Sequence, residues 1–334
     1  MKKLINKPEN FIDEMLEGLY LAYPDQVKCV DGDLRALVKT SRKPGKVGIA
    51  TGGGSGHLPL FLGYVGDGML DGCSVGDVFQ SSGADQMLAV TREIDSGAGV
   101  LYIYGNYNGD KLNFELSAEM AEMEHNIRVE RVIGRDDVSA DDPAVRRGVA
   151  GIFFVYKCAG AAADEMMDLD QVTAIARRAA DNVRTMGVGL SPCIVPRVGH
   201  PSFELAEDEM EIGMGIHGEP GVRRGKLLPA DEVADEIMGK LLKDMPIEKG
   251  GEVAVLVNGL GATPLEEQFV IFRRIHQILS EKEISIVKVY VGEYATSMEM
   301  AGLSISLFKL DSELKRLLAK PARTPFWGQP QLDL

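Results

Sequence analysis

One histidine lies in a segment that is unusually rich in glycine. Residues 213–221 read Gly-Met-Gly-Ile-His-Gly-Glu-Pro-Gly, so small residues surround His217. Such a segment does not form a regular helix, and it leaves the imidazole free to approach a ligand. A lone histidine is more often structural, but an exposed imidazole nitrogen is a competent nucleophile toward a carbonyl carbon. The segment therefore predicts a reactive histidine, which Glu219 can orient.

A second glycine-rich segment follows the predicted strand Lys46–Ala50. It reads Thr-Gly-Gly-Gly-Ser-Gly-His and ends at His57. Its glycines allow close approach of the backbone to a ligand, and successive N–H groups can bind an anion or a hydroxyl. We expect Gly54, Ser55 and Gly56 to bind substrate, with His57 facing the same ligand; the alternative is a plain turn into a helix. The segment is neither a Walker A loop nor a dinucleotide fingerprint.

A polar turn follows the predicted strand Gly99–Tyr104. It reads Gly-Asn-Tyr-Asn-Gly-Asp and ends at Asp110, which as a turn former can equally cap the next helix. Ligands of open α/β sheets bind at the carboxyl ends of strands. Asp110 can therefore face the same crevice as His57 and serve as a general base.

Two further segments carry weaker signals. Residues 258–264 again follow a predicted strand, and we expect Thr263 to cap the next helix with Pro264 at its first position. The acidic pair Asp136 and Asp137 has no defined ligand spacing. We interpret it as part of a solvated loop and predict no metal site.

Strands and helices alternate along the chain, a pattern typical of α/β layers. It predicts two α/β domains with mixed or parallel sheets. The first, residues 1–187, carries the glycine-rich substrate loops, and the second, residues 188–334, carries His217. Further predicted strands are Arg128–Ile133, Val253–Asn258, Ser285–Val291 and Ser304–Leu310. Predicted helices are Asn10–Tyr23, Asn113–Glu124, Leu169–Met186 (capped by Asp168), Ala230–Leu242 and Thr263–Lys282.

Composition excludes several classes of protein. The 334 residues carry a net charge of −14, which argues against nucleic-acid and anionic-membrane partners. No apolar stretch approaches the roughly 20 residues that a membrane helix needs, and the polar N-terminus is unlike a signal peptide. The four cysteines form no C-x-x-C pair, so we expect reduced thiols in a cytoplasmic protein.

Taken in order, these segments resemble the DhaK family, the dihydroxyacetone-binding subunits of bacterial dihydroxyacetone kinases. The resemblance covers essentially the whole chain. It is carried by Gly-Gly-Gly-Ser-Gly-His at 52–57, Asn-Tyr-x-Gly-Asp with Asn-Phe at 106–114, Gly-Ile-His-Gly-Glu-Pro-Gly at 215–221 and Asn-x-Leu-Gly-Ala-Thr-Pro at 258–264.

The resemblance implies a homodimer of two-domain subunits that holds a small ketose as a covalent hemiaminal between C2 and His217. It implies that His57 and Asp110 contact the substrate hydroxyls and assist phosphoryl transfer. No cofactor is expected on this chain. ADP or ATP and magnesium are expected on a DhaL-like partner, and the donor is ATP or, through a phosphocarrier subunit, phosphoenolpyruvate.

Two positions depart from the family pattern: Leu58 stands where many members have Glu, and Gly105 where many have Lys. Dihydroxyacetone and a four-carbon ketose such as erythrulose therefore both stay open. The alternative function is a ketose-sensing transcriptional coregulator, which needs His217 but no general base, so Asp110 favours the kinase. A nucleotide-binding oxidoreductase is disfavoured because no acidic residue is suitably placed for a ribose.

Overall fold

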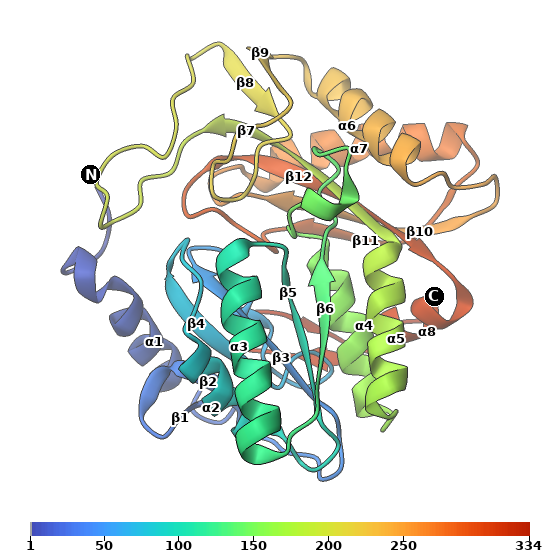
Figure 1. Ribbon diagram of the computed structural model, residues 1–334. Helices are drawn as coiled ribbons and strands as arrows, with labels where there is room; N and C mark the ends of the chain where they lie inside the picture. The colour runs from blue at the N-terminus through green and yellow to red at the C-terminus, as the bar shows by residue number, and fades with distance from the viewer. Residues whose placement is uncertain (1) are drawn as a thin grey trace.

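The computed structural model describes residues 2–334 and contains two six-stranded sheets (Figure 1). The first sheet has the order β1-β2-β4-β3-β5-β6, and its strands β4, β3, β5 and β6 run parallel. Its strands are β1 (Val27–Val30), β2 (Asp33–Lys39), β3 (Gly48–Ser55), β4 (Gly72–Val78), β5 (Val100–Gly105) and β6 (Val129–Gly134).

The second sheet has the order β11-β10-β12-β7-β8-β9 and is antiparallel except for the β10–β11 pair. A short β13–β14 pair follows near the C-terminus. The strands are β7 (Val183–Ser191), β8 (Glu209–Ile212), β9 (Arg223–Lys226), β10 (Glu252–Gly259), β11 (Ser285–Gly292), β12 (Ala301–Leu310), β13 (Ala322–Arg323) and β14 (Gly328–Gln329).

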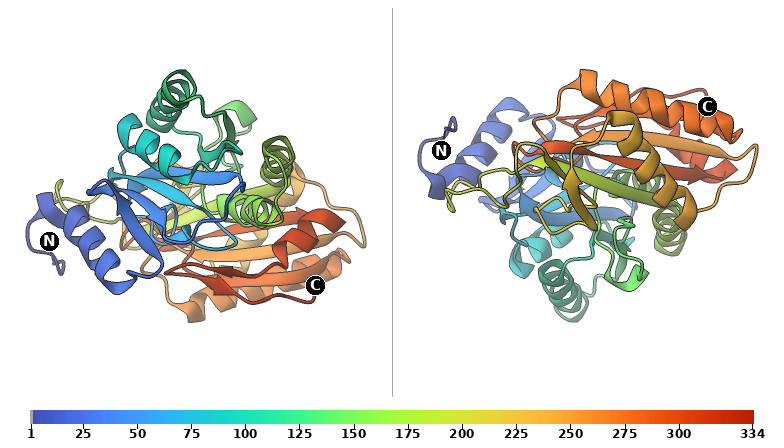
Figure 2. Two further views of the ribbon diagram at one scale, coloured as in Figure 1. Left: turned by 90° about the horizontal axis from the view of Figure 1, so that it is seen from below. Right: turned by 90° about the horizontal axis from the view of Figure 1, so that it is seen from above.

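The helices and the two sheets form stacked layers (Figure 2). Helices α2 and α3 cover the outer face of the first sheet, α4 and α5 lie between the sheets, and α6 and α7 cover the outer face of the second. The α-helices are α1 (Phe11–Ala22), α2 (Ala84–Ile94), α3 (Asn108–His125), α4 (Ile152–Asp164), α5 (Leu169–Asp181), α6 (Ala230–Asp244), α7 (Leu265–Glu281) and α8 (Ser312–Leu318).

Helix α4 joins the two halves because it is apolar all round. Its sequence Ile-Phe-Phe-Val-Tyr-Lys-Cys-Ala-Gly-Ala-Ala-Ala-Asp is buried from Ile152 through Ala163. A helix with that composition belongs in the interior of a protein. Phe154 stacks on Phe308 of β12, while Tyr156 shares a hydrogen bond of 2.8 Å with Thr51 of β3. One helix thus fixes both sheets in one core.

The predicted fold class is confirmed, and all six predicted strands are present. Asp168 caps α5 through a capping box with Gln171, as expected. The predicted end of that helix at Met186 is wrong, because β7 begins at Val183 and pairs there with β12. The division of the chain near residue 187 stays a prediction.

Two local predictions need correction. Thr263 does not cap α7: its hydroxyl donates to the Gly302 carbonyl, and Pro264 occupies the cap position. The glycines before His57 are not a loop, since β3 continues through Ser55 before the chain turns. Among residues 2–334, none of the helices is both long and apolar enough to span a bilayer.

Candidate functional site

Three parallel strands of the first sheet end beside one another and supply one side of the site. His57 follows β3, Ser81 follows β4, and Asp110 lies in the first turn of α3 after β5. His217 comes from the other sheet, on the loop that joins β8 to β9. The site therefore forms where a long hairpin loop of the second sheet reaches the carboxyl edge of the first, the edge at which open α/β sheets bind ligands.

A cavity at this junction brings three of the predicted residues together: Gly54, Asp110 and His217 all line it. His57 packs against the His217 ring with centroids 4.8 Å apart. Ser55 and Gly56 instead line a neighbouring cavity that Gly54 and His57 share. The Ser55 hydroxyl donates to the Gly76 carbonyl, so its side chain stabilises the sheet.

His57 is held as a neutral imidazole. Its Nδ1–H donates to the Thr296 carbonyl at 2.7 Å, which leaves Nε2 as an acceptor. Nε2 is buried and has no hydrogen-bond partner. Burial, assisted by the neighbouring His217, lowers the pKa of His57 to about 3. A buried acceptor without a partner is costly, and a hydroxyl from a ligand would satisfy it.

His217 has a defined orientation. Its Nδ1 lies 2.9 Å from Oε1 of Glu219, whose Oε2 accepts the backbone N–H of His217. Burial would raise the pKa of Glu219, but the hydrogen bond and charge of His217, together with Arg147, lower it to about 2. Because the carboxylate is ionised, Nδ1 carries the proton. Nε2 is then left without a proton, and Glu219 orients the histidine as the sequence predicted.

Asp110 is a buried carboxylate with one strong donor. The Ser81 hydroxyl donates to its Oδ1 at 2.5 Å. Burial raises the pKa of Asp110 to about 6, against the opposing effects of Ser81 and His217. A carboxylate with a pKa just below neutral is suited to accept a proton at physiological pH.

Aromatic side chains that the sequence did not single out enclose these polar groups. Phe79 stacks on His57 with centroids 4.9 Å apart, and Phe61 meets the same ring edge-on. Tyr107 and Phe79 both contact His217 edge-on. Phe61 and Phe79 have positive φ angles of 67° and 59°, an unusual backbone conformation that concentrates at functional sites.

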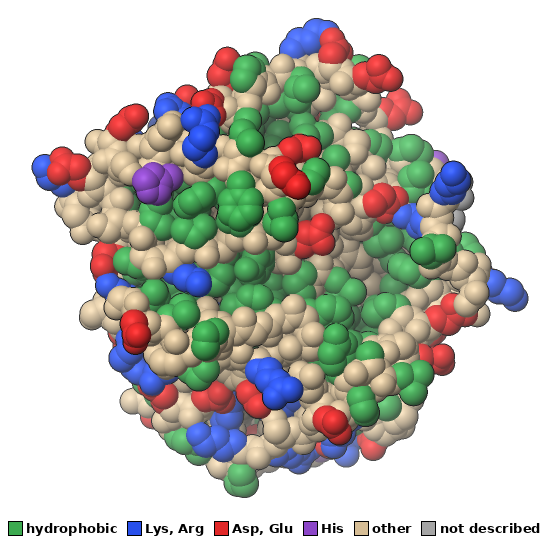
Figure 3. Space-filling view, turned by 180° about the vertical axis from the view of Figure 1, so that it is seen from behind, with side chains coloured by type: hydrophobic (Ala, Val, Ile, Leu, Met, Phe, Trp, Pro, Cys, Tyr) green, Lys and Arg blue, Asp and Glu red, His purple; other side chains and the backbone are tan. Residues whose placement is uncertain are grey.

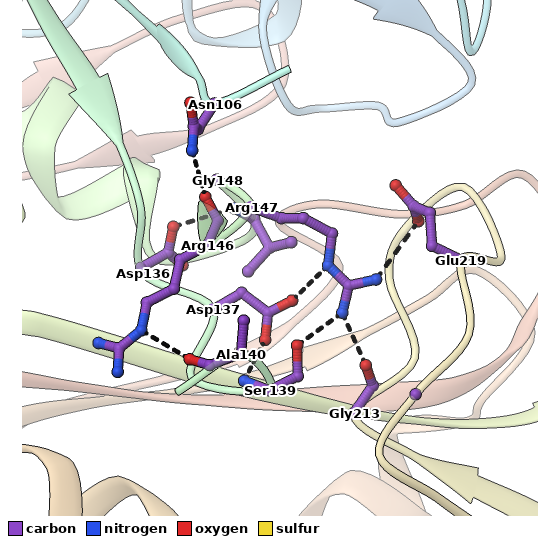
Figure 4. A network of polar contacts seen from close by, with 12 residues as sticks. Asn106, Asp136, Asp137, Ser139, Ala140, Arg146, Arg147, Gly148, Gly213 and Glu219 are labelled. Atoms are coloured by element: carbon purple, nitrogen blue, oxygen red, sulfur yellow. Dashed lines mark hydrogen bonds and ion pairs between the residues drawn. The ribbon is translucent and has the colours of Figure 1, made fainter. Parts of the chain in front are cut away.

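The interpretation of the acidic pair as a solvated loop is wrong. Asp136 accepts the backbone N–H groups of Val149 and Gly151, and Asp137 pairs with Arg147 at 2.7 Å. Both carboxylates are buried, and Figure 4 shows them in a polar network beside the His217 loop. Arg147 was missed because nothing in its local sequence connects it with a segment some 70 residues later. Within residues 2–334, no cluster of side chains has the composition of a metal site.

Fold and site together define a two-domain α/β protein with a histidine-centred pocket between its sheets. The Dak1 domain family matches residues 17–326. The chain is 46% identical over 330 residues to the dihydroxyacetone-binding subunit DhaK of a PTS-dependent dihydroxyacetone kinase from Listeria innocua, covering 98% of this chain and 99% of that protein. The chain therefore belongs to the Dak1 family, and the resemblance to DhaK is confirmed.

Other similar proteins include an erythrulose kinase, a dihydroxyacetone kinase and an operon co-activator. A D-erythrulose kinase from Mycolicibacterium smegmatis is 42% identical over 328 residues, covering 97% of this chain and 56% of that protein. The crystal structure of the dihydroxyacetone kinase of C. freundii superposes with a TM-score of 0.91 at 30% identity, covering all of this chain and 62% of that one. The dihydroxyacetone kinase operon co-activator DhaQ superposes at 0.87 with 33% identity, covering 92% and 96%.

Proposed function

We propose that this chain is the ketose-holding subunit of a dihydroxyacetone-type kinase. The observation that carries the proposal is the arrangement of His217: its Nδ1 is bound to Glu219, and it lies in one pocket with Asp110 and against His57. Such a pocket supplies a nucleophile for a carbonyl carbon together with a base and an acceptor for hydroxyls.

The first step is formation of a hemiaminal. The Nε2 lone pair of His217 forms a bond to C2 of the ketose, and the carbonyl π bond breaks. The former carbonyl oxygen takes up a proton, while the Nδ1 proton leaves through Glu219, so the substituted imidazole stays neutral. Glycerol lacks a carbonyl and is excluded chemically, a discrimination that weak contacts to hydroxyls do not achieve.

Phosphoryl transfer to the fixed terminal hydroxyl follows. Asp110 takes the hydroxyl proton, and Nε2 of His57 accepts a hydrogen bond from substrate; with a pKa of about 3, His57 is too weak a base for the proton itself. The covalent bond supplies orientation, which is a large part of the rate in phosphoryl transfer.

The phosphate donor comes from partners. The sequence has no Walker A loop, so we propose that ADP or ATP and magnesium lie on a DhaL-like subunit, recharged by ATP or by a phosphocarrier. The purified chain alone should not phosphorylate a ketose from ATP. Phosphorylation should appear when a DhaL-like subunit and its donor are added, and comparing dihydroxyacetone with erythrulose would identify the substrate. Robust ATP-dependent turnover by the chain alone would contradict the proposal.

A second candidate function is a ketose-sensing coregulator, which the similarity to the DhaQ co-activator favours. A sensor needs a capturing histidine but no general base. The buried Asp110, with its pKa near 6, favours the kinase. Ketose capture without turnover beside an active DhaL-like partner would favour the sensor.

We further propose that the subunit is a homodimer. Figure 3 shows hydrophobic side chains gathered across the face opposite to that of Figure 1. Helix α7 exposes Leu265, Phe269 and Val270, and exposed apolar surface of this kind marks protein contacts. Light scattering should give twice the chain mass, and a monomer would refute this assembly.

A further inference from the structure

The guanidinium of Arg147 lies beside the loop that carries Gly213 and Glu219, and it connects this loop to Asp137 and Ser139 (Figure 4). Its Nε donates to Asp137 at 2.7 Å, and Nη2 donates to Ser139 at 2.8 Å and to the Gly213 carbonyl at 2.7 Å. Nη1 lies 3.9 Å from Oε2 of Glu219. One side chain therefore holds the start of the loop and faces the carboxylate that orients His217.

The loop sequence leaves room for this contact. A Cβ at Gly215 would collide with Oε2 of Glu219 and lie 2.5 Å from Nη1 of Arg147. The backbone N–H of Gly215 also donates to the Glu219 carbonyl at 3.1 Å. The absence of a side chain at residue 215 is thus what allows the guanidinium and the carboxylate to meet.

Charge gives the contact a chemical consequence. The titratable or charged groups that face His217 are Glu219, His57, Tyr107, Asp110 and, through Glu219, Arg147. Burial would raise the pKa of Glu219, but the contacts with His217 and the guanidinium of Arg147 lower it to about 2. Arg147 thus helps to keep the Glu219 carboxylate ionised, and the ionised carboxylate holds Nδ1 of His217 and leaves Nε2 free.

We propose that Arg147 is a positioning residue for ketose capture: it holds the His217 loop and faces the Glu219 carboxylate, so that this carboxylate keeps Nδ1 of His217 bound and Nε2 free. This inference rests on the proposed hemiaminal function. Arg147 touches no reacting atom and acts only through Glu219 and Gly213.

The test uses the full chain and dihydroxyacetone labelled with ¹³C at C2. Capture converts the ketone carbon into a protein-bound tetrahedral carbon, which NMR separates from the free ketone and its hydrate, and ¹⁵N labelling of histidine reports which ring nitrogen of His217 carries the proton. Arg147→Met should weaken capture by ~10–100-fold, the range seen when a hydrogen-bonded partner of a metal-ligating histidine is removed, and should shift the proton of His217 from Nδ1 toward Nε2. Arg147→Lys should restore the proton on Nδ1, because a positive charge still faces Glu219. It should only partly restore affinity, because an ammonium lacks the guanidinium fork.

Arg224→Met is the matched control, since Arg224 pairs with Glu209 on the same hairpin but at its exposed base. Arg224→Met should capture ketose with the affinity of the wild-type chain. Arg147→Met also leaves Asp137 without its partner, so Gly215→Ala provides a second variant that keeps every charge but displaces the Glu219 carboxylate from both Arg147 and His217. Unchanged capture and an unchanged Nδ1 proton in Arg147→Met and Gly215→Ala would overturn the inference. Absence of a tetrahedral carbon in the wild-type chain would instead overturn the proposed function itself.

Discussion

The two sides of the pocket hold their histidines by different means. His57 is 1% exposed, continues from a paired strand and is packed between Phe61 and Phe79. The side chain of His217 is 22% exposed and lies on a loop stabilised by a few polar contacts. The His57 side is packed like a protein core. The geometry of the His217 side depends instead on the charged groups of Glu219 and Arg147.

This difference suits the roles proposed above for the two histidines. An acceptor that only receives a hydrogen bond benefits from rigid burial, which also keeps it neutral. A nucleophile that forms and breaks a bond with each substrate needs space for C2 to change geometry, and a half-exposed loop provides it. Substitutions should therefore affect stability on the His57 side and chemistry on the His217 side.

The largest effect is expected at His217. His217→Ala and His217→Gln should abolish the protein-bound tetrahedral ¹³C signal, because His217 supplies the imidazole nitrogen in the lining of the cavity. The exposed His200, on the segment between β7 and β8, provides the control: His200→Ala should capture ketose like wild type. Undiminished capture by His217→Ala would mean that the ketose binds elsewhere, and both the kinase and the sensor proposals would fall.

The next effect is expected at Asp110 and concerns turnover alone. Asp110→Asn should still capture ketose, but phosphorylation with a DhaL-like partner should fall by about 10²–10⁴-fold, the usual cost of losing a general base. In wild type, turnover should decline as pH falls below about 6, where Asp110 becomes protonated. Glu115→Gln, an exposed change on the same helix, should leave the rate and this pH dependence unaltered. If Asp110→Asn phosphorylated the ketose at the wild-type rate, Asp110 would be only a turn residue, and the ketose-sensing function would be favoured.

Sequence patterns predicted the polar centre of the site better than its surroundings. His57, Asp110 and His217 stood out because glycines or turn formers precede each of them after a strand or within a loop. Helix α4 escaped detection because a helix that is apolar on every side has no amphipathic period. The Gly52–Gly54 run was misassigned because glycine is typical of turns, whereas here it lets β3 pass close to Phe61 and to the backbone at Phe79.

Arg147 and Asp137 show a second limit of prediction from sequence. The packing of the two sheets brings them to the His217 loop, and no local sequence pattern indicates a contact between residues some 70 positions apart. The signal in the sequence that could have found this ion pair is the acidic pair Asp136-Asp137 with two arginines ten residues later, but we interpreted the acidic pair as part of a solvated loop.

The smallest predicted effect concerns protein stability. It compares an added methyl group at one glycine on the His57 side of the pocket with one at a glycine on the His217 side. A Cβ at Gly54 would lie 2.6 Å from the backbone N of Gln80, and a strand-bound backbone cannot easily move aside. Gly54→Ala should therefore lower the free energy of unfolding by roughly 1–3 kcal/mol, as overpacking does. A Cβ at Gly215 meets only the ends of the Glu219 and Arg147 side chains, which can rotate away. Gly215→Ala should keep nearly wild-type stability while losing capture.

Thermal and urea unfolding of both variants would measure the difference. Gly239→Ala is the control for the added methyl group, because nothing lies within 4 Å of a Cβ at that position in α6, and alanine stabilises a helix by about 1 kcal/mol relative to glycine. If Gly215→Ala proved as destabilising as Gly54→Ala, the His217 loop would be packed as tightly as the His57 side. Packing would then orient the His217 loop, and the charge of Arg147 would contribute little to that orientation.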